Sequence, residues 1–268
     1  MRVTHYLKTI SLIVSTFVII CLIGGCGTQQ TNPNIILILT DDLGYGDVSC
    51  YNPDSIIKIP YIDKLASEGM MFTDAHSPSS ICTPTRYGIL AGRYCWRSRL
   101  KRGVFGGYDK PLIEKDRPTV ASFLKDNGYA TACVGKWHLG WNWGTKDGYQ
   151  AEWDGDYEQE DIDFANPISH GPNELGFDYF FGTSGCPTDD LPFCYIENTK
   201  TVGVPDRYAA EDPAYEDRLL MAVKDWRHED ADFEFMIKAL SFMENSTKKG
   251  KFFFVSPPFR ASYSLVTS

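Results

Sequence analysis

Short apolar runs alternate with stretches of helical periodicity along most of the chain. Asn34–Thr40 and Phe252–Ser256 are continuous apolar runs, which are typical of strands buried on both faces of a parallel sheet. Met70–Ala75 and Tyr129–Gly135 also predict strands. Because strands alternate with helical stretches, the pattern predicts an α/β fold with a mainly parallel sheet and flanking helices.

Four helices are predicted from apolar periodicity and glycine stops: Tyr61–Glu68, Thr85–Ala91, Thr119–Asn127 and Asp230–Asn245. Thr119 or Asp116 is expected to cap the third helix. Five apolar residues recur at helical spacing in the fourth helix and predict its apolar face: Phe233, Met236, Ile237, Leu240 and Met243. Trp141–Asp225 is rich in Gly, Pro, Asp and aromatic residues, which predicts a long excursion over the edge of the sheet.

The amino-terminal segment has the pattern of an export signal. Residues 1–25 contain a basic region, an apolar run shorter than the roughly 20 residues that span a bilayer, and small residues before Cys26. Residues 23–26 resemble a bacterial lipobox, in which Cys26 carries lipid, while a plain signal peptide is the alternative. Residues 26–33 then form a tether. We expect an exported protein, at the periplasm or cell surface of a bacterium, with a lipid anchor in the membrane.

The net charge of the chain limits which classes of molecule it can bind. The 268 residues carry a formal net charge of −9, and 43% of them are apolar. This acidic balance argues against nucleic acid as a partner, because phosphate binding needs clustered Lys and Arg. An anionic substrate stays open, since a local cluster of cations or a metal can reverse the field inside a pocket.

Two adjacent carboxylates follow the first predicted strand. Asp41 and Asp42 lie at its carboxyl end, where ligands bind in open α/β sheets. Two such carboxylates repel each other unless a cation neutralises them, and their oxygen atoms favour Ca²⁺ or Mg²⁺. A solvated turn is the alternative for this pair.

A cysteine, a proline and an arginine follow in a Cys82-x-Pro84-x-Arg86 spacing. A helix amino terminus favours negative charge on a nucleophile or a bound oxyanion, and the guanidinium donors of Arg86 suit sulfate or phosphate oxygens. Further on, Lys136 and His138 are two residues apart after a strand, so both can reach one site. Lys136 can neutralise negative charge and His138 can move a proton. A small core cysteine and surface cations are the alternatives.

Four blocks together resemble the type I sulfatases of the arylsulfatase A-like group, in the alkaline-phosphatase-like superfamily: Asn34–Gly46, Cys82–Arg93, Gly135–Gly140 and Gly176–Gly182. The resemblance implies an alkaline-phosphatase-like fold, with residues 34–268 as the amino-terminal catalytic domain. It also implies that a maturation enzyme oxidises Cys82 to formylglycine. The substrate would be a sulfated small molecule or a sulfated glycan.

The same resemblance implies roles for the candidate residues. Asp41 and Asp42 would bind Ca²⁺, or Mg²⁺, together with the formylglycine at Cys82. Arg86 would stabilise the formylglycine hydrate, Lys136 would contact the sulfate ester and His138 would assist proton transfer.

The carboxyl-terminal residues depart from the family pattern. Ser262 stands about where the family has a histidine after a proline, and neither the later Asp-Asn pair nor the carboxy-terminal subdomain is found. We therefore expect the domain to be incomplete. Two alternatives to an active sulfatase follow: an inactive truncated fragment, and a phosphoesterase or phosphonate hydrolase of the same superfamily.

Overall fold

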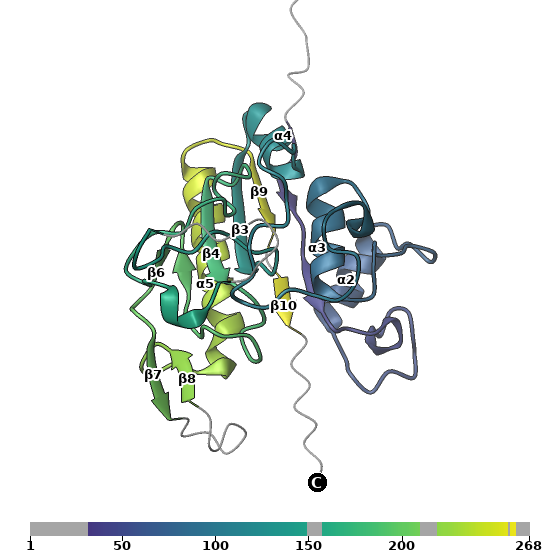
Figure 1. Ribbon diagram of the computed structural model, residues 1–268. Coiled ribbons are helices and arrows are strands. Elements are labelled where there is room, and N and C mark those ends of the chain that lie inside the picture. Colours follow the sequence, from purple (N-terminus) through teal and green to yellow (C-terminus); the bar gives the residue numbers. More distant parts are fainter. Residues whose placement is uncertain (1–31, 149–156, 210–218, 257, 261–268) are drawn as a thin grey trace, which may run out of the picture. The chain divides into compact units, whose positions relative to one another are not determined.

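A computed structural model describes residues 32–148, 157–209, 219–256 and 258–260 (Figure 1). The chain divides into two compact units, residues 1–33 and 34–268, and every described helix and strand lies in the second. The predicted signal peptide, Cys26, nearly all of the tether and Ser262 lie outside the described residues.

A six-stranded, mostly parallel sheet forms the centre of the second unit. Its strands are, in spatial order, β1 (Ile35–Ile36), β9 (Phe253–Ser256), β3 (Ala130–Lys136), β4 (Tyr179–Thr183), β5 (Ile196–Glu197) and β6 (Lys200–Thr201). The first four are parallel to one another, β5 pairs antiparallel with β4, and β6 pairs antiparallel with β5. The predicted α/β class is confirmed. The stretch expected to be an excursion, however, supplies three strands of the sheet.

Two smaller sheets and four α-helices complete the described elements. β2 (Leu39–Asp41) pairs with β10 (Pro258–Arg260), and β7 (Asp206–Ala209) pairs with β8 (Leu219–Ala222). The helices are α2 (Pro60–Glu68), α3 (Cys82–Ala91), α4 (Val120–Asp126) and α5 (Ala231–Lys248). Short 3₁₀ helices lie at Tyr45–Asp47, Cys95–Arg97, Gln159–Asp161 and His228–Asp230. No helix in the described part of the chain could cross a membrane.

Local signals account for the ends of the shorter helices. The N–H of Ser122 donates to Thr119 Oγ1 at 3.0 Å, so Thr119 caps α4 as predicted. Gly92 ends α3 in the left-handed conformation, with φ of 62°. α3 begins three residues earlier than predicted, so Cys82 belongs to its first turn.

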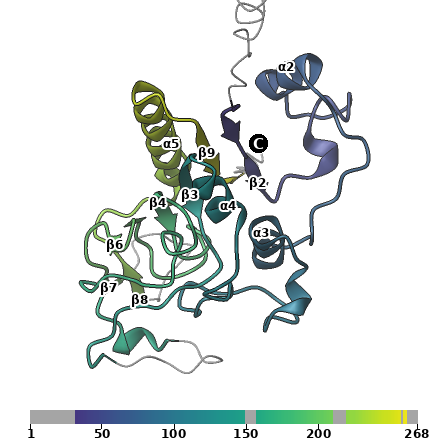
Figure 2. The same cartoon turned by 90° about the horizontal axis from the view of Figure 1, so that it is seen from above.

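Apolar side chains fill the space on both faces of the sheet. On one face, Phe235 and Ala239 of α5 pack against Ala132 and Val134 of β3. On the other, a larger cluster includes Trp137, Trp141, Trp143, Phe177 and residues of α3 and α4. Figure 2 shows α5 on one side of β9 and β3, with α3 and α4 on the other.

Three predictions from the apolar pattern are wrong. The predicted Asn34–Thr40 strand is divided into β1 and β2, and Ile36 and Ile38 are exposed because β1 is an edge strand. Met70–Ala75 forms no strand. Four of the five residues of the predicted apolar face of α5 are exposed: Phe233, Met236, Ile237 and Leu240. Alanines at positions 231 and 239 let α5 approach the sheet closely, so the buried stripe contains Ala231, Phe235 and Ala239 instead.

Candidate active site

Three of the predicted site residues meet around one ammonium group. Lys136 Nζ, at the end of β3, donates to Asp41 Oδ2 at 2.8 Å and lies 3.1 Å from Cys82 Sγ. Asp41 ends β2 and Cys82 begins α3, so three separate elements converge here. Since one ammonium contacts both groups, the carboxylate oxygen and the sulfur lie no farther apart than the sum of these two distances. The strand ends and the helix start therefore form one site.

Burial and ion pairing have opposite effects on the pKa values of Lys136 and Asp41. Lys136 is 5% exposed, and burial alone would lower its pKa, but nearby Cys186 and Asp41 raise it overall. Burial would likewise raise the pKa of Asp41, but the Lys136 ammonium and the Arg86 guanidinium lower it. Both groups are therefore charged at neutral pH and form a buried ion pair.

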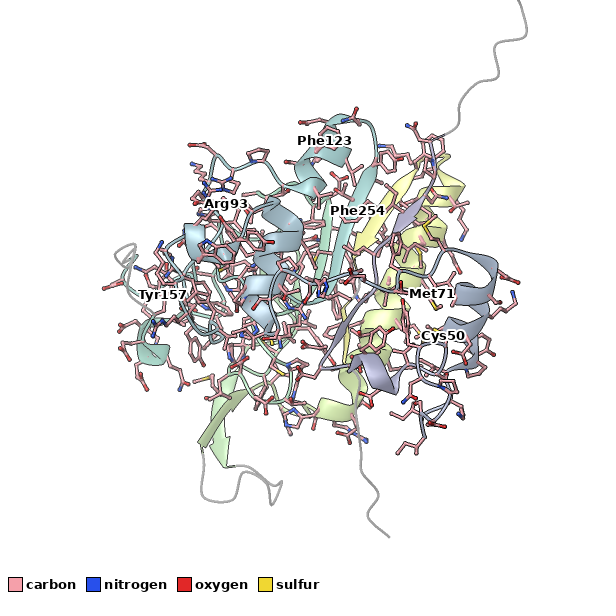
Figure 3. All side chains as sticks on the ribbon, turned by 90° about the vertical axis from the view of Figure 1, so that its right-hand side faces the viewer. Cys50, Met71, Arg93, Phe123, Tyr157 and Phe254 are labelled. Carbon is pink, nitrogen blue, oxygen red and sulfur yellow. The ribbon has the colours of Figure 1, made fainter. Side chains whose placement is uncertain are left out.

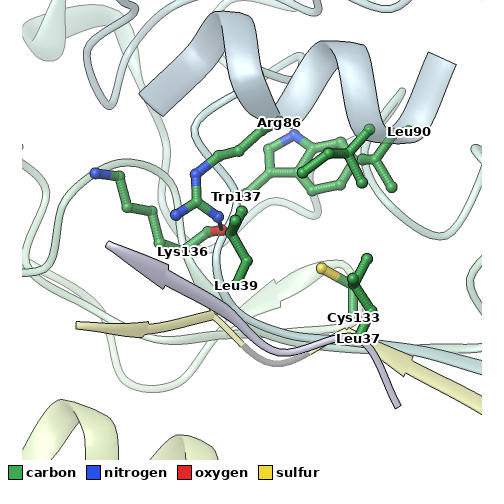
Figure 4. Close-up of a pocket in the computed structure, with 8 residues that line it drawn as sticks. Leu37, Leu39, Arg86, Leu90, Cys133, Lys136 and Trp137 are labelled. Carbon is green, nitrogen blue, oxygen red and sulfur yellow. Dashed lines mark hydrogen bonds between the residues drawn. The ribbon is translucent and has the colours of Figure 1, made fainter. Parts of the chain in front are cut away.

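Arg86 connects α3 to the end of β3. Its Nη1 donates to the backbone carbonyl oxygen of Lys136 at 2.8 Å, and its Nη2 lies 3.6 Å from Asp41 Oδ2. Figure 4 shows this side chain reaching from the helix toward the strand below it. Arg86 is buried, and its Nε has no hydrogen-bond partner among the described residues. Asp41 thus faces two cations, a field that suits an anionic ligand.

His138 lies just beyond Lys136, with φ of 58° and 3% of its surface exposed. Its Nε2 faces the carbonyl oxygen of Phe105 and lies 3.4 Å from Asp190 Oδ2. Because both neighbours are acceptors, Nε2 carries the proton and Nδ1 keeps a lone pair. No hydrogen-bond partner of Nδ1 is found within the described ranges. Burial and the Lys136 ammonium lower the pKa of His138 to about 3, so its ring is neutral at physiological pH.

Backbone contacts hold His138 behind the start of α3. Thr83 Oγ1 donates to the backbone carbonyl of His138 at 2.9 Å and accepts from the N–H of Phe105 at 3.1 Å. No hydrogen bond joins the imidazole to Cys82 or Asp41 in the described part of the molecule. The structure therefore places His138 beside Lys136, with its Nδ1 buried.

A cavity of about 350 Å³ opens where β2 ends and α3 begins. Asp41, Asp42, Cys82 and Arg86 all line it. Asp42 adopts a left-handed conformation, with φ of 60°, which turns the chain just after the strand. Cys82 is half-buried, and it begins a ten-residue helix whose amino terminus favours negative charge. Cys82, the Arg86 guanidinium and two carboxylates therefore share one cavity, and Lys136 contacts two of these groups.

The cavity offers the type of ligand atom that a hard divalent cation prefers, but fewer of these atoms than such a cation needs. Asp41 and Asp42 offer carboxylate oxygens to the same cavity, whereas Ca²⁺ takes roughly 6–8 oxygen ligands. Among the described residues, no group of three or more His, Cys, Asp or Glu side chains is arranged to hold a metal. Lys136 and Arg86 already neutralise Asp41. The described residues alone therefore do not complete a metal site.

The loop after β4 is the part of the site that sequence reasoning missed. Asp190 lies against His138 and accepts the N–H of Cys186 at 2.6 Å. Burial raises the pKa of both Asp190 and Cys186. The available sequence signal is the adjacent acids Asp189 and Asp190, which follow the Gly176–Gly182 block.

Comparison with known proteins identifies one family. The family model described as "Sulfatase" matches residues 33–258. A curated N-acetylgalactosamine-6-O-sulfatase of Bacteroides thetaiotaomicron is 36% identical over 206 residues, which are 74% of this chain and 37% of that protein. Human steryl-sulfatase is 39% identical over 164 residues, which are 58% and 24% of the two chains.

A solved structure has a similar fold. It is titled for the metabolism of multiple glycosaminoglycans by Bacteroides thetaiotaomicron, and it matches with a TM-score of 0.70 at 28% identity. The match covers 87% of this chain and 52% of the other. The chain thus spans about a quarter to about half of the length of these relatives.

Proposed function

This chain belongs to the sulfatase family, and we propose that its site hydrolyses sulfate esters, with sulfated carbohydrates as the substrate class. The observation that carries the proposal is the position of Lys136, whose ammonium contacts both Asp41 and Cys82 Sγ. A cation beside the nucleophile is suited to an ester whose transferred group carries negative charge.

We propose that Cys82 is converted to formylglycine by a maturation enzyme that reads Cys82-x-Pro84-x-Arg86. In the hydrated aldehyde, one hydroxyl would attack sulfur while the bond from sulfur to the ester oxygen breaks and the alcohol leaves. The second hydroxyl would then expel the sulfate as the aldehyde re-forms. Lys136 and Arg86 stabilise the negative charge that develops on the sulfuryl oxygens. The amino terminus of α3 adds its partial positive charge at the same position.

His138 is suited to accept a proton in this site. Its ring is neutral at working pH, and its Nε2–H is committed to Phe105, so Nδ1 has the free lone pair. A neutral ring adds no further positive charge beside Lys136, and because its pKa is about 3, a proton that it accepts is held weakly and passed on. We assign His138 to that proton transfer.

A divalent cation, Ca²⁺ or Mg²⁺, would be held by Asp41 and Asp42. Its remaining oxygen ligands would come from water, substrate or chain outside the described residues. It would supply Lewis acidity to the sulfuryl oxygens and to the nucleophile.

The carbohydrate preference is supported by one of the curated relatives. Its name identifies it as an N-acetylgalactosamine-6-O-sulfatase, and it shares 36% identity over 74% of this chain. We further propose export through residues 1–25 and lipid attachment at Cys26, which together would place the enzyme at a bacterial periplasm or cell surface.

The proposal is tested on the full chain co-expressed with a formylglycine-generating enzyme. We expect the peptide that contains Cys82 to lose about 18 Da as thiol becomes aldehyde, and we expect release of inorganic sulfate from N-acetylgalactosamine 6-sulfate. Cys82→Ala abolishes both results, while Cys50→Ala, at a half-buried free thiol, retains both.

Two results would count against the proposal. An unmodified thiol after co-expression removes Cys82 as the nucleophile. Protein that carries formylglycine but releases no sulfate from sugar or aryl esters is an inactive fragment, and cleavage of phosphate monoesters alone identifies a phosphoesterase.

A further inference from the structure

The segment between Asp74 and Asp109 has an unusual charge. It contains six Lys or Arg residues and no Asp or Glu, although the whole chain has a formal net charge of −9. Arg86 faces the reaction cavity, and the other five follow the end of α3: Arg93, Arg97, Arg99, Lys101 and Arg102. This segment of an acidic protein thus carries only positive charges from its Lys, Arg, Asp and Glu residues, and it follows directly on the candidate site.

A second cavity lies at the carboxyl end of α3. It has a volume of about 350 Å³, and its walls include Ser77, Arg93, Tyr94 and Arg97. Ser77 also lines the reaction cavity, so the two cavities are neighbours with a common wall. Figure 3 shows Arg93 beside α3.

Close packing of α3 against this common wall separates the two cavities. A Cβ atom on Gly88 would lie 2.6 Å from the ring of Pro78, so only glycine allows this approach without a shift. Thr85 Oγ1 donates to the backbone carbonyl of Ser79 at 2.6 Å and holds the same wall at its other end. The relative position of the two cavities is therefore set by direct contacts with α3.

An aromatic pair lies next to the second cavity. The rings of Tyr94 and Trp96 stack with centroids 4.1 Å apart and planes 12° apart. They are nevertheless 52% and 55% exposed, so flat apolar surface stays in contact with water. Exposed aromatic surface beside a pocket is typical of a binding site, and a flat ring suits the apolar face of a sugar.

The arginines of this cavity have different roles. The guanidinium of Arg93 is already bound to Tyr87 and Glu114, which anchors it. Arg97 is exposed, and no ion pair or side-chain hydrogen bond of its guanidinium is found in the described ranges. A planar guanidinium binds a tetrahedral oxyanion or a carboxylate through two parallel hydrogen bonds. Arg97 is therefore the cation available to an anionic ligand.

We propose that this second cavity, defined by Arg93, Tyr94 and Arg97, is a subsite for a further anionic group of a sulfated glycan chain. The proposal rests on the proposed function, because the sulfate ester that reacts occupies the neighbouring cavity. Gly88 packs against Pro78 between the two cavities, so a sugar that reacts in the first does not fill the second. The subsite therefore selects an oligosaccharide, whose adjoining sugar packs on Tyr94 while its sulfate or carboxylate binds Arg97.

Binding is measured on the full-length Cys82→Ala variant, so that turnover does not enter the result. Isothermal titration compares a chondroitin 6-sulfate hexasaccharide with its desulfated form and with N-acetylgalactosamine 6-sulfate. We expect the sulfated hexasaccharide to bind most tightly. Adding Arg97→Gln or Tyr94→Ala should weaken its binding about tenfold, since a hydrogen-bonded charge or a sugar-packing ring is lost.

Lys200→Gln is the matched control, because it removes one exposed positive charge from β6 and should leave hexasaccharide affinity unchanged. Circular dichroism and thermal unfolding verify that each variant folds. Equal affinity for hexasaccharide and monosaccharide, or unchanged binding by both folded subsite variants, overturns the subsite. Arg97-dependent binding to phosphatidylserine vesicles or to single-stranded DNA that is tighter than binding to the hexasaccharide also overturns the subsite.

Because no turnover is involved, hexasaccharide binding that depends on Arg97 and Tyr94 supports the subsite even if the matured enzyme releases no sulfate. Sulfate release with unchanged hexasaccharide binding by the subsite variants would instead leave the proposed function standing without this subsite.

Discussion

Because the pKa of His138 is low, the free energy of unfolding should change with pH in the mildly acidic range. The ring is 3% exposed, and its pKa is lowered from 6.5 to about 3 by burial and by Lys136. Below pH 6.5 the unfolded chain takes up a proton that the folded protein does not bind. The unfolded state then binds more protons, so the free energy of unfolding falls as pH decreases from 6.5 toward 3, and His138 has no effect above this range.

The size of the effect follows from the shift. Each pH unit below 6.5 removes about 1.4 kcal/mol, so lowering the pH from 7 to 5 costs about 2 kcal/mol. Total stabilities of domains are only about 5–15 kcal/mol, which makes this loss measurable. Asp41 affects a lower range, because a carboxylate with a lowered pKa loses its stabilising effect only as the pH falls below about 4.

Urea unfolding, followed by tryptophan fluorescence at half-unit steps from pH 5 to 7.5, measures the loss. His138→Gln removes the titrating group but keeps an amide that can donate to Phe105. This variant should lose the His138 part of the slope between pH 6.5 and 5. The pKa of His170 is also lowered by burial, so His170→Gln serves as the control and should keep that part. A wild-type stability that is flat from pH 7 to 5, or an unchanged slope in His138→Gln, would refute the reasoning.

Two further predictions concern the packing of the site. Lys136→Met should destabilise the fold by about 3 kcal/mol, because it leaves Asp41 buried with only the more distant Arg86 as a cation; a denaturation midpoint close to that of the wild type would contradict this. Gly88→Ala should cost about 1–3 kcal/mol, because the new methyl group meets Pro78, even though alanine favours helix; a rise in melting temperature would contradict the contact.

The chemistry of the candidate site could largely be predicted from local sequence. The spacing Cys82-x-Pro84-x-Arg86 predicted Cys82 and Arg86 as site residues, and the strand-end position predicted Asp41. Helix limits at Gly69 and Gly92 were equally local, since a stop depends on the conformation of one residue and its neighbours.

Sequence alone could not show how these parts contact one another. The bridge from Lys136 to both Asp41 and Cys82 joins residues that are 95 and 54 positions apart, so the tertiary arrangement of β2, α3 and β3 decides it. The same holds for Asp190, which reaches His138 because β4 lies beside β3. Sequence patterns carry no distance between such segments.

Packing, and not the apolar pattern, also decides which face of α5 is buried. In α5 two stripes have helical periodicity, and the stripe with the larger residues, such as Phe233 and Leu240, is exposed. The stripe that contains Ala231 and Ala239 packs on the sheet, because small side chains let the helix backbone approach the sheet closely. The amino-acid sequence by itself thus determined the family, the candidate site residues and the glycine stops of the helices, which depend on neighbouring positions. Tertiary structure alone decided which faces are buried and which side chains meet, because both depend on the shape of surfaces brought together from distant parts of the chain.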